Sequence, residues 1–368
     1  MASSREKQPG ATPPASVMAA PRRAPTAHDV AALAGVSQSA VSRCFTPGAS
    51  ISEETRQRVQ AAAEQLGYRP NLIARSLIKR RSTIIGVVIP GLQNPFYAAM
   101  LEALSADLAT AGYRILLFNA PARGTPDPVL DEMLNYRVDA LILVSSSLSS
   151  GLADECQKIG LPVVQLNRTT ERSTVSSVVG DNHGGAEAIA RFLLACEHER
   201  FAFIAGLETS STGKAREAAF LGTLGAAGKP VARGVANYAF EEAEGIARQM
   251  LGGANPPDAI FCASDHMAIA ALGVARTEFG LTIGRDISIV GFDDIQMAGW
   301  PQISLTTYRQ PVRAMSSRAV AMIEAQLQGT GTGSGLSEVV PGDLVVRGST
   351  REPAHGVIDL GYERVWRP

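Results

Sequence analysis

Four polar residues on one short segment have the chemistry needed to read DNA: Gln38, Ser39, Ser42 and Arg43. Their side chains donate and accept hydrogen bonds, as the recognition of base edges and phosphates in a major groove requires. The same pattern also fits the solvated face of a small helical subdomain. The elements that carry these residues therefore decide between the two interpretations.

The residues around this segment predict a helix-turn-helix. Val30, Leu33 and Ala34 recur on one face at helical spacing, and Gly35 then breaks the first helix. Ser37 is placed to cap a second helix, which carries the four polar residues. Two helices that meet at a steep angle need a residue without a side chain at the corner, which Gly35 supplies.

A third helix completes the predicted unit. Residues 52–55 open it with a capping pattern and Gly67 ends it. Its apolar stripe consists of Val59, Ala62, Ala63 and Leu66. We therefore predict a three-helix DNA-binding headpiece over residues 25–70.

The segment that follows, residues 71–82, predicts a short helix. Pro70 keeps the chain extended, and Asn71 can cap a helix whose apolar residues are Leu72, Ile73, Leu77 and Ile78. About eight residues are too few to hold a helix alone in water. Its apolar side chains therefore need a partner surface that buries them. An ordinary interdomain linker is the alternative.

At this point the sequence resembles the lactose-repressor family of bacterial transcription regulators. Five phrases match the family in order and spacing: Asp29-Val30-Ala31, Ala34-Gly35-Val36-Ser37, Val41-Ser42-Arg43, Gly67-Tyr68-Arg69-Pro70-Asn71 and Ala74-Arg75-Ser76-Leu77. Several ordered matches are far more specific than one short motif.

The resemblance implies roles for individual residues. Gln38 and Ser39 would contact base edges, and Arg43 would hold a phosphate or reach a guanine. The other phosphate contacts would come from Thr26, Ser37, Ser42, Thr55 and Asn71. In residues 71–82, which would act as a hinge helix, Leu77 would wedge into the central base step of the minor groove, with Ala74 and Ile78 beside it.

The charge distribution agrees with a DNA-binding end. Residues 22–81 contain ten Lys or Arg against four Asp or Glu, whereas residues 82–368 contain 22 against 30, within a net charge of -1. A basic face attracts any polyanion, so the charge predicts affinity without specificity.

The composition fits a soluble protein of two or three domains, with 45% hydrophobic residues in 368. The first 24 residues, rich in Pro, Ala and Ser, predict a disordered extension. We expect no membrane span, because no apolar run is long enough. The four scattered cysteines suggest neither disulfides nor a zinc site, so we expect a cytoplasmic protein associated with the nucleoid.

From residue 83 onward, strands alternate with helices, which predicts doubly wound α/β architecture. The expected strands are 84–90, 114–119, 140–145, 163–167, 176–179, 201–205, 259–263 and 287–291. A region of this length favours two lobes rather than one sheet. We place it at 83–351 and expect residues 352–368 to form a separate tail, in which Tyr362 and Trp366 either pack or stay mobile.

The resemblance extends over this region and implies a fold like that of periplasmic sugar-binding proteins. Two α/β lobes would be joined by three crossing strands, with a ligand held between them. The matching phrases are Asn94-Pro95-Phe96-Tyr97-Ala98, Val179-Gly180-Asp181-Asn182, Ala263-Ser264-Asp265, Ile289-Val290-Gly291-Phe292-Asp293-Asp294 and Leu305-Thr306-Thr307.

A ligand cleft is expected outside the carboxyl ends of the strands. By resemblance, Phe96 and Tyr97 would flank the effector, Arg216 would bind it, Asp265 would accept its hydrogen bonds and Phe240 would stack on it. The full predicted effector site is Phe96, Tyr97, Asn167, Thr212, Arg216, Phe240 and Asp265.

Three residues near this cleft have two interpretations each. An Asp at a strand end often caps a helix, so Asp181 and Asp294 are open between cap and ligand contact. Lys214, beside Arg216, indicates either an anionic effector or a solvated helix face.

Enzyme functions find no support in the motifs. The chain has no Walker phosphate loop, no Gly-x-Ser-x-Gly elbow and no His-Glu-x-x-His helix, and its five histidines form no cluster in sequence. We expect no cofactor. A transport receptor for a sugar-like molecule would fit the two lobes but would not carry the headpiece.

The sequence therefore predicts a homodimeric regulator, a repressor in the first instance, that binds an inverted repeat of operator DNA. A small-molecule effector, sugar-like or another small polar metabolite, would control its operator affinity. The identity of the effector, the sign of its action and the choice between dimer and tetramer stay open.

Overall fold

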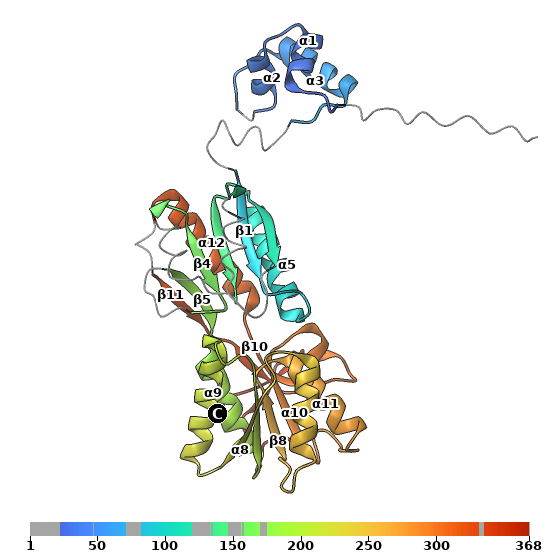
Figure 1. The fold of residues 1–368 in the computed structure, drawn as a ribbon, viewed down its shortest axis with the longest axis vertical. Coiled ribbons are helices and arrows are strands. Elements are labelled where there is room, and N and C mark those ends of the chain that lie inside the picture. The colour runs from blue at the N-terminus through green and yellow to red at the C-terminus, as the bar shows by residue number, and fades with distance from the viewer. Residues whose placement is uncertain are drawn as a thin grey trace, which may run out of the picture. The chain divides into compact units, whose positions relative to one another are not determined.

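The computed structural model describes residues 23–46, 48–70, 82–119, 133, 135–145, 156, 158–169, 175–330 and 335–367. The chain divides into two compact units, residues 1–80 and 81–368 (Figure 1). The predicted hinge segment lies almost entirely outside the described residues, because 71–81 are among those not described.

The first unit contains the predicted helix-turn-helix, formed by α1 (Ala27–Ala34), α2 (Gln38–Cys44) and α3 (Glu53–Leu66). Thr26 and Asp29 form a capping box at the start of α1, and Ser37 caps α2 by accepting from the Ala40 amide. Gly35 ends α1 with a φ of 64°, a left-handed conformation that glycine adopts without steric cost.

Small apolar residues bury the contact between these helices. Val30, Val41 and Val59 are almost completely buried. Leu33, which was expected on the same apolar face as Val30, is instead 47% exposed. Because successive residues turn by about 100°, Leu33 lies on the flank of Val30 that faces away from Ala31 and from the helix contact.

The second unit begins with a lobe built on one parallel sheet, which we call the N-terminal lobe. Its strands follow the order β11-β5-β4-β3-β1-β2. They are β1 (Ile84–Ile89), β2 (Arg114–Asn119), β3 (Ala140–Val144), β4 (Val163–Leu166), β5 (Ser176–Gly180) and β11 (Ser337–Val340). Helices α5 (Pro95–Thr110) and α12 (Val312–Gln328) pack against each other on this lobe (Figure 1).

The C-terminal lobe has a mixed sheet of order β13-β14-β12-β10-β9-β8-β6-β7. Its strands are β6 (Phe201–Ala205), β7 (Val231–Val235), β8 (Ala259–Cys262), β9 (Ser288–Asp293), β10 (Thr306–Arg309), β12 (Asp343–Val345), β13 (Val357–Asp359) and β14 (Arg364–Trp366). Its helices are α8 (Asn182–Ala195), α9 (Ser211–Ala226), α10 (Phe240–Leu251), α11 (Asp265–Thr277) and the 3-10 helix η1 (Gln296–Gly299).

The chain passes between the lobes three times, which confirms the predicted two-lobed fold. It leaves the N-terminal lobe after β5, returns after β10 and leaves again after β11. The crossings touch one another: the Asp181 amide donates to the Val340 carbonyl at 2.9 Å, and the Gly342 amide donates to the Tyr308 hydroxyl at 2.8 Å. A movement of one crossing therefore affects the others.

Residues 352–367 belong to the C-terminal lobe rather than to a separate tail. Strands β13 and β14 pair antiparallel with each other, and β14 pairs with β12. Trp366 is 6% exposed and its ring packs edge-on against Phe192 at a centroid distance of 5.7 Å. The boundary expected at residue 351 therefore does not separate a free segment.

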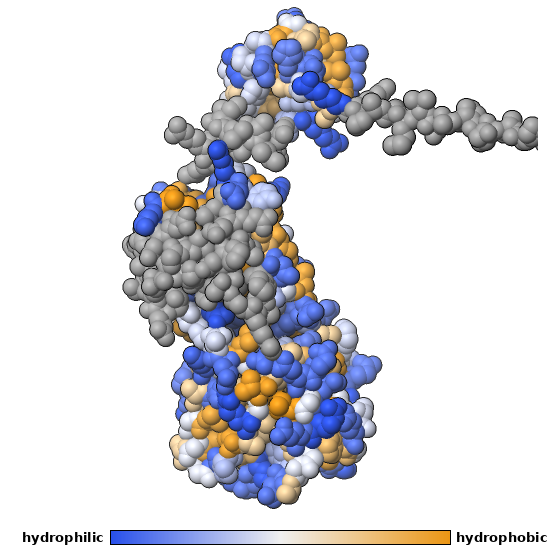
Figure 2. All heavy atoms as spheres, viewed as in Figure 1, coloured by the Kyte–Doolittle hydropathy of each residue, from blue (hydrophilic) through white to orange (hydrophobic). Residues whose placement is uncertain are grey.

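Hydrophilic residues cover much of the C-terminal lobe in the face shown in Figure 2, with hydrophobic patches between them. The four cysteines are buried. Within the described residues, no helix combines the length and the hydropathy that a transmembrane span requires.

Candidate functional site

The predicted DNA-reading side chains share one exposed face of α2. Gln38, Ser39, Ser42 and Arg43 are exposed, whereas Ala40, Val41 and Cys44 on the opposite face are buried. The hydroxyls of Ser37 and Ser39 hydrogen-bond to each other at 2.8 Å. The helix thus presents a row of short polar groups with one guanidinium, and its apolar side anchors it to α1 and α3.

Three of the predicted phosphate contacts, Thr26, Ser37 and Thr55, lie at helix starts. Thr26 caps α1, and its hydroxyl also donates to the Asp29 carboxylate at 2.7 Å. Thr55 lies in the first turn of α3, where its hydroxyl accepts from Ser52 at 2.8 Å. Helix starts carry unpaired amides and a partial positive charge, which suits a phosphate. The other predicted DNA contacts, Asn71, Ala74, Leu77 and Ile78, lie outside the described residues.

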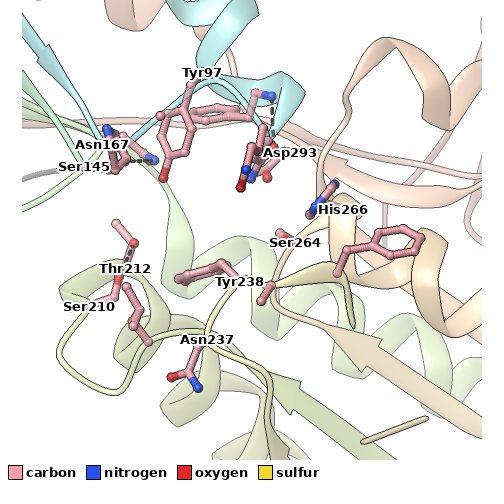
Figure 3. Close-up of a pocket in the computed structure, with 18 of the residues that line it drawn as sticks. Tyr97, Ser145, Asn167, Ser210, Thr212, Asn237, Tyr238, Ser264, His266 and Asp293 are labelled. Atoms are coloured by element: carbon pink, nitrogen blue, oxygen red, sulfur yellow. Dashed lines mark hydrogen bonds between the residues drawn. The ribbon is translucent and has the colours of Figure 1, made fainter. Parts of the chain in front are cut away.

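A cavity of about 550 Å³ lies between the two lobes of the second unit (Figure 3). The N-terminal lobe contributes side chains from α5 and from the ends of β3 and β4. The C-terminal lobe contributes residues that follow β6, β7 and β8, and the last residue of β9. Six of the predicted effector residues line it: Phe96, Tyr97, Asn167, Thr212, Arg216 and Phe240. This volume suits a small organic ligand.

Asp265, the seventh predicted residue, does not line the cavity. It is completely buried, and both of its carboxylate oxygens have partners: Oδ1 accepts from the Thr307 hydroxyl at 2.5 Å and Oδ2 accepts from the Ile295 amide at 2.8 Å. Burial, together with the nearby Asp293 carboxylate, raises the pKa of Asp265. The expectation that this carboxylate faces the effector is therefore not met; its neighbours Ser264 and His266 line the cavity instead.

Arg216 is held in place by the protein itself. Its Nε donates to Asn182 Oδ1 at 2.8 Å, and its Nη1 donates to the Ala263 carbonyl at 2.5 Å. The guanidinium lies over the Phe292 ring, 3.7 Å from the centroid, and Nη2 is 3.8 Å from Asp293 Oδ1. Cation–π contact and charge pairing offset the cost of burying this cation.

Asp293 connects the cavity to a crossing segment. It lines the cavity, and its Oδ1 accepts from the Gln310 side-chain amide at 2.7 Å, just after β10. Burial raises the pKa of Asp293 to about 6, against the opposing effects of Arg216 and Gln310. Asp293 therefore links the cavity lining to the second crossing through Gln310.

Arg168 bridges the two lobes. Its Nη1 donates to the Ser145 carbonyl in the N-terminal lobe at 3.0 Å, and its Nη2 donates to the Thr209 carbonyl in the C-terminal lobe at 2.8 Å. The next residue continues the bridge, because the Thr169 amide donates to the Ser211 hydroxyl at 3.0 Å. Burial lowers the pKa of Arg168.

Sequence reasoning missed several residues of the cavity, including Ser145, Tyr238 and His266. Tyr238 follows β7, whose sequence lacks the apolar pattern that predicts a strand. His266 packs its ring on Phe240 at a centroid distance of 5.3 Å, and burial lowers its pKa. Ser145 could have been predicted from its position directly after β3, and His266 from its position next to Asp265.

Strained backbone gathers around the cavity. Among the described non-glycine residues, ten have a positive φ, and five of these line it: Ser145, Asn167, Asn237, Tyr238 and Asp293. Such conformations cost energy and persist where the surroundings fix them, most often at functional sites. The strain supports a ligand-binding role for this cavity.

The open interpretations near the cavity resolve as structural roles. Asp181 caps α8 by accepting from the Gly184 amide at 2.8 Å. Asp294 pairs with Arg309 and Arg347. Lys214 is exposed and does not belong to the cavity lining.

The fold and the site together define a class: a helix-turn-helix DNA-binding unit followed by a two-lobed ligand-binding unit. Residues 26–71 match the family described as bacterial regulatory proteins, lacI family, and residues 190–350 match the periplasmic binding protein-like domain.

Named relatives are similar to this chain over most of its length. The HTH-type transcriptional repressor CytR of Escherichia coli K12 is 31% identical over 334 residues, covering 89% of this chain and 97% of CytR. The HTH-type transcriptional regulator CelR of Thermobifida fusca is 30% identical and covers 84% of this chain and 94% of its own. The lac repressor dimer bound to operator and the anti-inducer ONPF superposes with a TM-score of 0.79 at 27% identity, covering 89% of this chain and 100% of the repressor chain.

The chain belongs to the lacI family of bacterial regulatory proteins. It is a DNA-binding transcriptional repressor with an effector-binding domain, and not an enzyme.

Proposed function

We propose that two copies of this chain bind an inverted repeat of operator DNA and that an effector in the interlobe cavity sets their operator affinity. Residues 25–70 read the operator, residues 71–82 form the hinge helix and residues 83–367 bind the effector and dimerise. The protein works in the cytoplasm, on the nucleoid.

One observation carries this proposal: the exposed polar face of α2, together with the interlobe cavity on the same chain. The lac repressor dimer, which superposes over 89% of this chain, is bound to operator and an anti-inducer, and CelR has been solved in complex with cellobiose. A receptor for transport alone would not use the α2 face.

On each half-site, Gln38 and Ser39 contact base edges and Arg43 contacts a phosphate or a guanine. Thr26, Ser37, Ser42, Thr55 and Asn71 hold phosphates and fix the register. Two hinge helices meet in the minor groove, where Leu77 wedges into the central step with Ala74 and Ile78 beside it.

In the second unit, Tyr97, Asn167 and Phe96 contact the effector from the N-terminal lobe, and Thr212, Arg216 and Phe240 contact it from the C-terminal lobe. Closure of the lobes moves the crossings at Gly180, Gln310 and Gly342. The N-terminal lobe, whose first strand follows the hinge segment, passes this movement to the hinge helices. The coupling of the two sites is reciprocal and amounts to about 1–3 kcal/mol.

The test is selection of genomic DNA fragments by the purified full chain at about 0.15 M salt, with and without small-molecule metabolites. Enrichment of an inverted repeat, with binding lost on dilution to monomers, is the expected result. Enrichment of a single half-site, or of no sequence under either condition, would contradict the proposal.

A further inference from the structure

We propose that the effector is an uncharged ring compound that presents hydrogen-bond donors, rather than a phosphorylated compound or a sugar acid. This inference rests on the proposed function of the interlobe cavity and narrows its ligand. It follows from which polar groups of the cavity are already occupied and which are not.

The two arginines of the cavity lining already make hydrogen bonds within the protein. Arg216 donates to Asn182 and to the Ala263 carbonyl, stacks on Phe292 and faces Asp293. Arg168 donates to one carbonyl in each lobe. Of the Arg216 nitrogens, only Nη2 has no hydrogen bond among the described residues, and the Asp293 carboxylate 3.8 Å away already offsets its charge. Lys214, the remaining cation considered from the sequence, is exposed and outside the lining.

One hydrogen-bond acceptor in the cavity lining has no hydrogen-bond donor among the described residues. Asn167 is only 7% exposed, and its Nδ2 donates to the Ser145 hydroxyl at 3.0 Å, yet its Oδ1 is buried without a hydrogen-bond partner among the described residues. A buried acceptor without a donor is unfavourable, because its lost hydration is not replaced. A hydroxyl or N–H group of the effector would remove that cost, whereas a phosphate or carboxylate would place another acceptor against it.

The carboxyl groups of the cavity lining also disfavour an anionic effector. Asp293 lines the cavity, and Glu241 lines it from the first turn of α10. Both groups repel an anion and accept from a hydroxyl or N–H donor. Together with Asn167, these carboxylates add hydrogen-bond acceptors to the cavity lining.

Aromatic rings supply the remaining surface and favour a ring. Tyr97 and Tyr238 lie on opposite sides of the cavity (Figure 3), and Phe240 packs on His266 beside them. Tyr238 is fixed over the backbone of Gly206, where a Cβ atom would lie only 2.1 Å from its ring. Rigid ring faces bind the apolar face of a sugar or a base.

The experiment uses matched pairs of probes on the purified full chain: uridine with its 5′-monophosphate, adenosine with its 5′-monophosphate, and galactose with galacturonate. Thermal unfolding is recorded with each probe at millimolar concentration. The same measurement is made with a metabolite extract separated on an anion exchanger into a bound and an unbound fraction. We expect only neutral probes, and only the unbound fraction, to raise the melting temperature.

Two variants test the role of the acceptor with whichever probe or fraction is active. Asn167→Asp keeps an acceptor and the left-handed backbone that Asn and Asp tolerate, so neutral compounds should bind within about threefold of wild type. Asn167→Leu removes the acceptor and should weaken binding at least about tenfold. The melting temperature of each variant without effector reports whether its second unit is folded.

An anionic probe or the bound fraction that stabilises the protein more than its neutral counterpart would overturn the inference. Equal binding by Asn167→Leu and wild type would also overturn it. If neither fraction changes the melting temperature or the operator affinity, the effector role of the cavity itself fails, and this inference with it. Recovery of an inverted repeat in the DNA selection would still support the DNA-binding role in that case.

Discussion

The guanidinium of Arg309, at the end of β10, forms an ion pair with the carboxylate of Glu363, in the turn before β14. Arg309 also donates to Asp294 at 2.6 Å, and Asp294 pairs with Arg347. The Glu363 carboxylate, followed by Asp294, raises the pKa of Arg309 beyond its usual value. The C-terminal strands therefore brace the second crossing between the lobes.

Replacing Glu363 with Gln should loosen this crossing. We expect faster hydrogen exchange at the amides of Gln310 and Gly342, and a change of two- to tenfold in effector affinity, because half-buried ion pairs exceed exposed ones in strength. Glu352→Gln is the matched control, since its pair with Arg364 is more exposed and lies away from the crossing. Equal exchange in the two variants would exclude the brace.

Replacing Gly180 with Ala should disturb the first crossing. A Cβ atom there would lie 2.6 Å from Gln310 Oε1, and Gln310 is held by Asp293. We expect a loss of about 1–3 kcal/mol in the free energy of unfolding from overpacking, with altered effector binding. Gly222→Ala, in α9, is the control, because its new methyl group meets nothing within 4 Å. Similar urea midpoints for both variants would contradict the expectation.

Replacing Gln38 with Ala should remove a base contact. Operator affinity should fall by about 1–3 kcal/mol and discrimination at one base position should relax, whereas non-specific DNA binding should change little. Gln57→Ala, on the exposed side of α3, should bind the operator like wild type. Competition binding with operator and random DNA measures both affinities, and equal losses on the two DNAs would place Gln38 away from the bases.

Acid should destabilise the second unit through His198. This histidine is 1% exposed and its Nε2 hydrogen-bonds to the Ser288 hydroxyl at 2.8 Å. Burial lowers its pKa to about 4, although the Asp258 carboxylate opposes the shift. The unfolded chain binds a proton below a pH of about 6.5, while the folded chain does not. The stability is therefore fully present above that pH and is lost as the pH falls toward about 4.

Urea unfolding at about pH 7.5 and pH 5 checks this effect, which should reach about 2 kcal/mol. His198→Gln keeps a hydrogen-bonding side chain without a titrating ring, so its stability should depend less on pH over this interval. If the variant and the wild type lose the same stability, other groups such as His266 account for the acid effect.

The headpiece could be predicted in detail because its signals are local. Caps such as Ser37, the break at Gly35 and the apolar spacing around Val30 act within one or two turns of helix. The same reasoning failed at Leu33, because the width of the buried face depends on how the neighbouring helices approach. Local patterns predict the existence of that face better than its edges.

The cavity was predicted less completely because its residues come from distant parts of the chain. Asp265 and His266 are neighbours in sequence, yet only His266 lines the cavity, since the first turn of α11 directs the carboxylate to Thr307. Tyr238 could not be predicted because β7 lacks an alternating pattern. The three-residue strands β13 and β14 form only by pairing with a sheet that is already present.

The three crossings also determine the order in which this protein can fold as it leaves the ribosome. The N-terminal lobe lacks α12 and β11 until about residue 340 has been made, and the C-terminal lobe lacks β14 until the last residues appear. Only the helical headpiece consists of one continuous early segment. A chain whose synthesis stops early would therefore carry a DNA-binding unit without the domain that dimerises and binds the effector, so its weakened DNA binding would not respond to any effector.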